Sequence, residues 1–257
     1  MLLDFKINRI IFFIGMVILF GITYYLVTVH EASTGMILVV ALIFVFVMNF
    51  TMKRVANNMY RYMHQLLYVY ADGEGYLEQV ESLYKRSARG RKLLQGAKLQ
   101  NLVMAYIFAG DLVKANELND TLQNKFGNAI QQQPQMRFSQ KLIDVMLVMF
   151  DYEKEAFNEK FEDLGKEVDT LQAETQEYVK NNPYSIYYMI DKTKSFIETE
   201  TITLEELEEA LKDENEFLKT SVIYTLSRLD KLSFDIPETL SRKDGNTLFY
   251  KDNERKF

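Results

Sequence analysis

Two long apolar runs near the start of the chain constrain its fold more than any other feature. Residues 10–29 read IIFFIGMVILFGITYYLVTV and residues 35–52 read GMILVVALIFVFVMNFTM, and neither run contains a charged side chain. A helix of about 20 residues is about 30 Å long, which matches the hydrocarbon core of a bilayer. Helices that are apolar on every face do not suit the surface of a soluble domain. We therefore predict that both runs cross a membrane.

The charges beside the two runs predict their orientation. Lys6 and Arg9 precede the first run, and Lys53 and Arg54 follow the second, whereas the connector 30–34 holds no lysine or arginine. Because cytoplasmic flanks are rich in these cations, we expect both termini in the cytoplasm and the connector outside. A cleaved signal peptide fits poorly, since the first run is too long and lacks a small-residue cleavage pattern. We expect a multi-pass protein of a bacterial plasma membrane.

Composition excludes several classes of function. The chain has 257 residues and a net charge of −6; residues 1–64 carry +3, which leaves −9 for the rest. An acidic bulk disfavours nucleic acid as a partner. The absence of cysteine removes thiolate chemistry and sulfur-ligated zinc, and two histidines are too few for a histidine metal cluster. We therefore expect no cofactor, no bound metal and no nucleic acid.

Beyond the second run, apolar residues recur at helical spacing, so we predict an all-α chain. We divide it into a transmembrane hairpin (1–56), a cytoplasmic helical domain (57–236) and a polar C-terminal tail (237–257). Within the domain, Leu142–Phe150 is apolar except for Asp144, which predicts a buried core helix. Thr203 followed by Glu206 predicts a capping box. Breaks between helices are expected at residues 72–75, 109–111, 127, 131–135 and 182–183.

Residues 96–127 carry the spacing of a known repeat, W-x2-L-G-x2-Y, a glycine turn, A-x3-F and a proline. Its positions are occupied, in order, by Leu99, Leu102, Val103, Tyr106, Gly110, Ala115, Asn119 and Gly127. The sequence here resembles the tetratricopeptide (TPR) repeat: Leu102, Tyr106, Gly110 and Ala115 match, and Leu99 replaces the tryptophan. Val103, Asn119 and Gly127 depart from the glycine, the aromatic residue and the proline.

The resemblance implies a solenoid of α-hairpins, and an irregular helical bundle is the alternative. Ala115 would let the second helix of the hairpin lie close to the first, Tyr106 would fill the groove between them, and Gly110 would permit the reversal. A partial second match lies 35 residues earlier at Leu67, Gly75 and Val80. Stacked hairpins form a concave groove that binds peptides or helices, so a protein partner is expected at the cytoplasmic helices.

A basic run interrupts the acidic domain. Its cations are Lys85, Arg86, Arg89, Arg91 and Lys92. One interpretation is contact with anionic lipid headgroups or an acidic partner. The alternative is the end of a helix, where cations complement the helix dipole.

These observations favour a membrane-anchored, non-catalytic scaffold or assembly factor. The carboxylates, including the run 205–209, fit the solvated faces of amphipathic helices, and no catalytic arrangement is recognisable. Two alternatives remain: an accessory subunit of a transporter or secretion complex whose spans make the specific contacts, and an enzyme with an unrecognised helical active site. The expected partners are membrane lipid and a protein, and self-association is left open.

Overall fold

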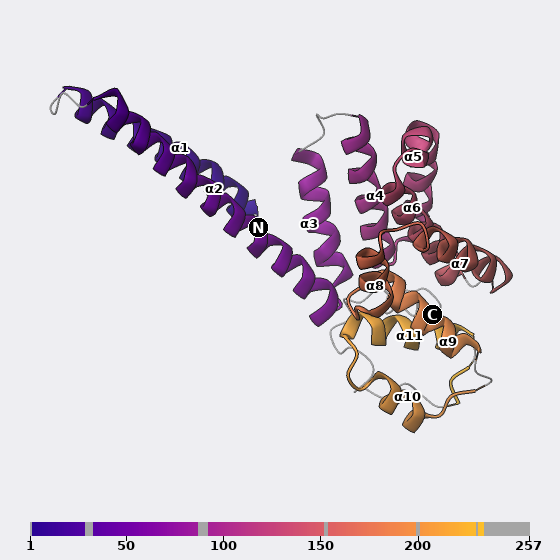
Figure 1. The fold of residues 1–257 in the computed structure, drawn as a ribbon. Helices are drawn as coiled ribbons and strands as arrows, with labels where there is room; N and C mark the ends of the chain where they lie inside the picture. The colour runs from indigo at the N-terminus through magenta and orange to yellow at the C-terminus, as the bar shows by residue number, and fades with distance from the viewer. Residues whose placement is uncertain are drawn as a thin grey trace. The chain divides into compact units, whose positions relative to one another are not determined.

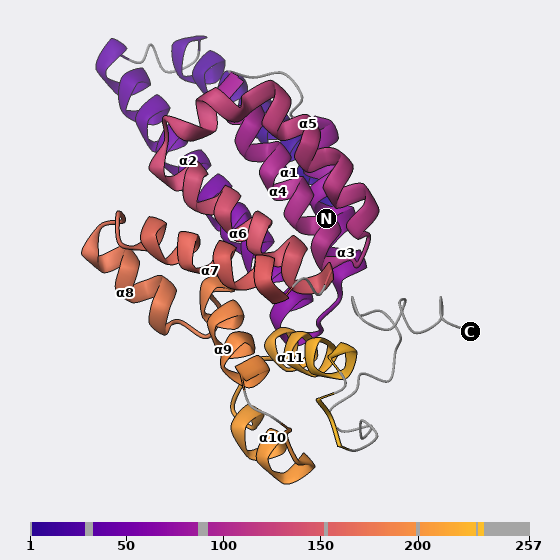
Figure 2. The same cartoon turned by 90° about the vertical axis from the view of Figure 1, so that its right-hand side faces the viewer.

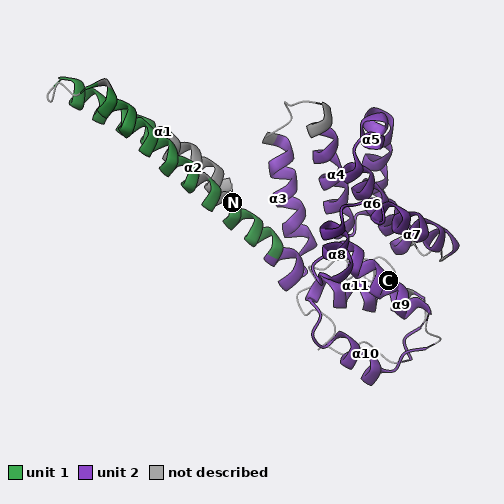
Figure 3. Ribbon diagram, in the orientation of Figure 1, with its two compact units in different colours: residues 1–64 green, residues 65–257 purple. Residues whose placement is uncertain are grey.

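The chain forms two compact units, residues 1–64 and 65–257 (Figure 3). The structure, a computed structural model, describes residues 2–28, 33–86, 92–151, 154–198, 201–229 and 231–233. Within these ranges the chain is all-α, with eleven α-helices, one short π-helix and a single isolated bridge between Ile202 and Leu232 (Figure 1). The all-α prediction is confirmed. The division falls after His64, whereas the sequence suggested 56, and the predicted tail 237–257 lies outside the described residues.

Unit 1 is a helical hairpin of α1 (Leu2–Thr28) and α2 (Thr34–His64), which pack against each other (Figure 1). The two helices approach closely at Gly15 of α1. A Cβ atom there would lie 3.2 Å from the Phe44 ring and 3.3 Å from the Met48 sulfur. Among the described side chains of this unit, Met48 is the buried apolar one, and most of the others on α1 and α2 are exposed. Over its described residues, the hairpin therefore has almost no core of its own.

The predicted membrane spans are not established by this structure. Within the described part of the chain, no helix has both the length and the apolar character needed to cross a bilayer. The predicted spans, 10–29 and 35–52, extend past the described side chains, which cover 13–28 of the first span and 35–51 of the second. The spans stay a prediction.

Unit 2 begins with the π-helix η1 (Gln65–Val69) and continues as packed helical pairs. The helices that follow are α3 (Gly73–Arg86), α4 (Lys92–Phe108), α5 (Leu112–Gln131), α6 (Pro134–Asp151) and α7 (Lys154–Val168). Each packs against the next, and α4 also contacts α6, so α4/α5 and α6/α7 form two stacked hairpins (Figure 2). This arrangement is compatible with a helical-repeat fold.

Four shorter helices follow α7, and the last of them returns to the start of the unit. They are α8 (Ala173–Asn181), α9 (Ile186–Glu198), α10 (Leu204–Leu211) and α11 (Glu216–Arg228). α11 packs against α9 and also against η1. In an open solenoid each repeat contacts only its neighbours, so this return contact departs from a simple solenoid.

An aromatic cluster makes the return contact. The Phe217 ring of α11 lies 4.9 Å from the Phe108 ring and 6.0 Å from the Tyr68 ring, and Tyr68 lies 5.3 Å from Tyr184, all centroid to centroid with edge-to-face geometry. Tyr76 contacts Phe108 at 5.6 Å. Burial raises the pKa of Tyr68 and that of Tyr76 above the ordinary tyrosine range, since it penalises the phenolate. These rings join η1, α3, α4 and α11 in one core.

Two glycines are required where helices meet. Gly110, between α4 and α5, has φ 73°, a left-handed conformation that glycine adopts without steric cost. Asp111 follows as the N-cap of α5, and its carboxylate accepts a bond from the Lys114 amide at 3.0 Å. At the start of α3, a Cβ on Gly73 would lie 1.8 Å from the Phe108 carbonyl oxygen. Backbone therefore meets backbone at this position.

Other local predictions have mixed outcomes. The buried core helix is confirmed, because Ile143, Val145 and Met146 of α6 are fully buried. The capping box is confirmed, with Thr203 and Glu206 exchanging hydrogen bonds at the start of α10. The expected break at Gly127 is wrong. The helix continues to Gln131, because one glycine weakens a helix without ending it, and the polar segment before Pro134 provides the break.

Candidate binding pocket between α6 and α7

The residues predicted to pack the repeat lie at the α4/α5 hairpin and its surroundings. Leu99 and Leu102 of α4 and Ala115 of α5 are buried, and Gly110 lies in the turn. The Tyr106 hydroxyl donates a 2.5 Å hydrogen bond to the Glu81 carboxylate of α3. This hydrogen bond is the main cause that raises the pKa of Tyr106 to about 12. Tyr106 thus links α4 to the helix before it, a contact not anticipated from the repeat pattern.

A departure from the repeat pattern coincides with a polar network. Asn119 of α5 occupies the position of the repeat's aromatic residue, and its Oδ1 accepts a bond from Gln140 Nε2 of α6 at 2.8 Å. The same amide donates to Asp144 Oδ1 at 2.9 Å. Gln100 Nε2 of α4 donates to the Met136 carbonyl at 2.8 Å. Gln100 and Gln140 are buried, so the α4–α5–α6 junction is held by satisfied polar groups.

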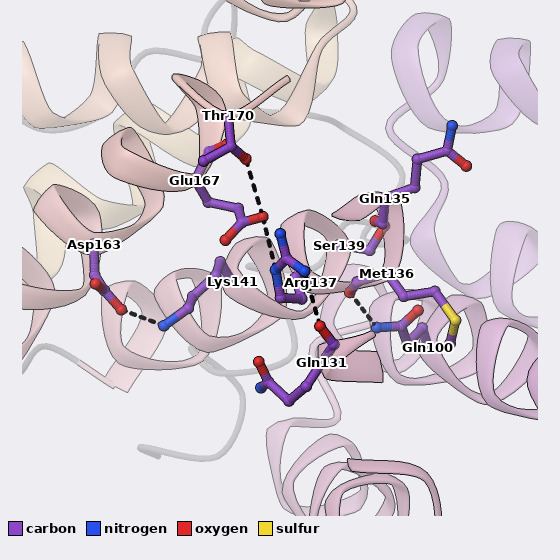
Figure 4. A network of polar contacts seen from close by, with 10 residues as sticks. All are labelled: Gln100, Gln131, Gln135, Met136, Arg137, Ser139, Lys141, Asp163, Glu167 and Thr170. Carbon is purple, nitrogen blue, oxygen red and sulfur yellow. Dashed lines mark hydrogen bonds and ion pairs between the residues drawn. The ribbon is translucent and has the colours of Figure 1, made fainter. Parts of the chain in front are cut away.

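Asp144 connects this network to a pocket of about 260 Å³ between α6 and α7. The pocket is lined by Lys141 and Asp144 from α6 and by Glu159, Lys160, Glu162, Asp163 and Lys166 from α7. Four carboxyl groups and three ammonium groups therefore share one small site. Lys141 pairs with Asp163 across the two helices (Figure 4).

The pKa values of two pocket carboxyls, Asp144 and Asp163, shift in opposite directions. Burial is the largest influence on Asp144 and raises its pKa, against the hydrogen bonds from Gln140 and Asn119 and the charge of Lys160. The hydrogen bond from Lys141 lowers the pKa of Asp163. Asp144 therefore accepts a proton more readily than Asp163, whose pairing with Lys141 favours the anion.

A second polar link fixes the walls of the pocket. Arg137 Nε of α6 donates to Glu167 Oε1 of α7 at 3.1 Å, and its Nη1 donates to the Gln131 carbonyl at 2.8 Å (Figure 4). Thr170 Oγ1 donates to the Glu167 main-chain carbonyl at 2.7 Å. Arg137 and Glu167 are partly buried, so their ion pair is less exposed to solvent screening than a surface pair. The pocket is thus held by two cross-links between α6 and α7.

The chemistry of the pocket suits recognition of polar or charged groups. Its walls offer hydrogen-bond donors, acceptors and both signs of charge within one cavity. Over the described residues, no group of three histidine, aspartate or glutamate side chains is placed to hold a metal ion.

Comparison with known proteins gives no match. No protein-family model, curated protein or solved structure matches this chain. The TPR resemblance therefore rests on the residues of this sequence and on the packing of α4 to α7.

The predicted basic contact is described only in part. Lys85 is exposed and pairs with Glu81 at 2.8 Å, one helical turn earlier. α3 ends at Arg86 and α4 begins at Lys92, and the side chains of both lie outside the described set, as do Arg89 and Arg91 entirely. Contact of this run with lipid or an acidic partner stays a prediction.

Sequence reasoning missed most of the pocket. Asp144 gave a signal, because it is the one charged residue in the apolar run Leu142–Phe150. Gln140 and Asn119 gave none, since amides are common on helix surfaces. The α7 side chains looked like an ordinary polar face, and only the packing of α7 beside α6 brings them to Asp144.

Proposed function

We propose that this protein is a membrane-anchored scaffold or assembly factor, in which unit 1 anchors the chain and unit 2 binds another protein. One observation carries the proposal: the large apolar side chains of both helices of unit 1 face outward. Phe13 is 72% exposed and Phe46 is 73% exposed. The other exposed members include Val17, Ile18, Phe20, Tyr24, Leu38, Leu42, Ile43, Val45 and Phe50.

Such a surface needs an apolar environment. Soluble monomers rarely expose apolar patches beyond a few hundred Å², and each exposed large side chain costs about 1.5–3 kcal/mol relative to its buried state. Lipid supplies that environment around a whole helix pair. The flanking cations Lys53 and Arg54 and the exposed Tyr24 and Tyr25 fit the two ends of a spanning hairpin, with both termini in the cytoplasm.

The binding role of unit 2 is supported by its stacked hairpins and by the charged pocket. Helical hairpins that stack as α4/α5 and α6/α7 do present continuous surfaces, and proteins of this kind use them to bind peptides or helices. We propose that the resemblance to the TPR repeat, given above for residues 96–127, extends to the hairpin α6/α7. The pocket between α6 and α7 adds fixed charges of both signs, which favour a partner segment that carries charged side chains. The role proposed is non-catalytic.

Crosslinking with mass spectrometry in native membranes tests the proposal. We expect reproducible crosslinks from the lysines of unit 2, including Lys141, Lys160 and Lys166, to one partner protein. A particle that remains alone in membranes and after solubilisation would contradict it.

Exchange of unit 1 for an unrelated two-span anchor separates the scaffold from its main alternative. If unit 1 is only an anchor, the crosslinks from unit 2 persist in the exchanged protein. If they disappear while the protein stays in the membrane, the spans make the specific contacts, as in an accessory subunit of a transporter or secretion complex.

A further inference from the structure

A second surface of unit 2 combines exposed aromatic rings with carboxylates. It forms an open hollow of about 530 Å³, lined by Glu174, Glu177, Tyr178 and Asn181 of α8 and by Asn182, Pro183 and Tyr184 after it. We refer to these seven residues as the α8 surface. The four α8 residues are spaced i, i+3, i+4 and i+7, which places them on one face of the helix. Val179 lies on the opposite side and is buried.

Both rings of this surface are accessible, and the segment that carries Tyr184 is held in place. Tyr178 is 58% exposed and Tyr184 is 46% exposed. The Tyr184 ring rests edge-on against the partly buried ring of Tyr68 at 5.3 Å. The segment before it is fixed by two hydrogen bonds, from the Tyr184 amide to Asn182 Oδ1 at 2.9 Å and from Asn215 Nδ2 to the Pro183 carbonyl at 2.7 Å. A partner would meet a surface that is already ordered, which reduces the entropy cost of binding.

The charge of the surface is negative. Glu174 and Glu177 line the hollow, and no lysine or arginine is found among its described lining residues. Lys180, the cation of α8 beyond this face, pairs instead with Asp169 at 3.2 Å. Two carboxylates beside two accessible tyrosine rings form the combination that attracts a cationic side chain, because the ring face and the carboxylate both favour positive charge.

We infer that the α8 surface binds a cationic segment of the protein partner, with arginine side chains lying over the tyrosine rings and paired with Glu174 and Glu177. This inference rests on the proposed scaffold function and names the chemistry of its partner. Arginine fits better than lysine, since its planar guanidinium stacks on an aromatic ring while donating to a carboxylate. Charge complementarity favours this occupant, because Glu174 and Glu177 lie within an acidic unit.

The test uses the full-length chain in nanodiscs of zwitterionic lipid, so that the bilayer itself does not attract the probe. The probe is a fluorescent peptide with four arginines separated by glycines, and its binding is followed by anisotropy at 0.15 M salt. We expect saturable binding of this peptide. The same peptide with lysine in place of arginine should bind more weakly, and the one with glutamate in place of arginine should not bind.

Variants locate the binding. Tyr178→Ser is expected to weaken binding about three- to five-fold, the range for loss of one exposed cation–π contact, and Tyr178→Phe should retain it. Adding Glu177→Gln to Tyr178→Ser should bring the loss to about ten-fold. The matched control is Glu208→Gln with Glu209→Gln on α10, where exposed carboxylates lie without this aromatic hollow; these changes should leave binding unchanged.

Three results would overturn the inference. They are no binding of the arginine peptide, equal loss in the α8 and α10 variants, and loss in Tyr178→Phe equal to that in Tyr178→Ser. A leucine-rich peptide that outcompetes the arginine peptide would assign an apolar partner to this surface instead. None of these results bears on whether the chain is anchored in a membrane, which is measured separately by extraction, so failure of the inference and failure of the proposed function are distinguishable.

Discussion

The two units of this protein place the same kinds of side chain in opposite environments. In unit 2, phenylalanine, leucine and isoleucine residues such as Phe108, Leu122 and Ile143 are fully buried. In unit 1, the same residue types project outward from α1 and α2. Because hydrophobic burial is the main force that stabilises a folded domain, unit 2 holds the core that stabilises it. For unit 1, we propose that lipid supplies the apolar contacts. The comparison predicts that identical kinds of substitution have different consequences in the two units.

The largest effect is expected at Gly73 of unit 2. Gly73→Ala places a Cβ atom 1.8 Å from the Phe108 carbonyl oxygen, and backbone on both sides prevents relief by side-chain rotation. We expect a loss of about 3–5 kcal/mol in the free energy of unfolding, or failure to fold, at the upper end of overpacking effects. Chemical denaturation of the full chain in detergent, followed by circular dichroism, measures it.

The counterpart in unit 1 is Gly21→Ala. At Gly21 of α1 a Cβ atom would meet nothing within 4 Å among the described atoms, so we expect no loss of stability. Equal losses in the two variants would break the contrast between a packed unit and an unpacked one.

The next largest effect is expected for a charge in the middle of the second apolar run. Leu42→Asp should make the free energy of membrane insertion less favourable by about 3 kcal/mol, the cost of an aspartate at the centre of a spanning helix. The measurement is the fraction of protein that resists carbonate extraction from membranes. The control is Val113→Asp on α5, an exposed apolar position of unit 2, where little change is expected. If the hairpin of unit 1 were stable in water, Leu42→Asp and Val113→Asp would have equally small effects.

A smaller effect is expected at the turn between α4 and α5. Gly110 has φ 73°, so Gly110→Ala should cost about 1 kcal/mol, because an L-residue with a Cβ is strained in this conformation. Gly110→Asn should cost less, since asparagine visits the left-handed region more easily. Thermal unfolding of the two variants and of the unaltered protein ranks their stabilities. If the Gly110→Ala variant is as stable as the unaltered protein, the turn does not hold this conformation in solution.

The smallest effect concerns Asp144 and pH. Since burial raises its pKa in the folded protein above the ordinary value of 3.8, the folded state binds the proton more tightly than the unfolded state does. The contribution of Asp144 to stability is therefore most favourable below pH 3.8 and decreases as the pH rises through its raised pKa. Asp144→Asn should remove this decrease and unfold at an equal or higher denaturant concentration at pH 7. A variant that is clearly less stable at pH 7 would show that the carboxylate is favourable there.

The part of the fold that sequence could predict is the part set by local chemistry. The helical periodicity, the capping box of Thr203 and Glu206 and the reversal at Gly110 all depend on residues within a few positions of one another. The break at Gly127 was predicted wrongly because helix ends depend on whether the following residues can continue the helix. The return of α11 to η1 could not be predicted, since Phe217 meets Tyr68 across more than 100 residues and no local pattern encodes that pairing.

The candidate sites were less accessible to sequence reasoning than the helices. The charged pocket needs Asp144 and Lys160 to come together from α6 and α7, and the α8 surface needs Tyr184 to be turned beside Tyr178 by the loop that follows α8. Polar residues at helical spacing look the same whether they face solvent or a cavity. The neighbouring helix decides between the two, and its position is a property of the packed unit.

Extraction of membranes that contain the full-length protein tests the claim that unit 1 anchors the chain in lipid. With a tag at each terminus, we expect the intact chain to stay with the membrane pellet after alkaline carbonate, and an external protease to reach neither tag in sealed cells stripped of their outer layers. Recovery of the intact chain in the aqueous fraction without detergent would contradict the claim, whatever the outcome of the other measurements.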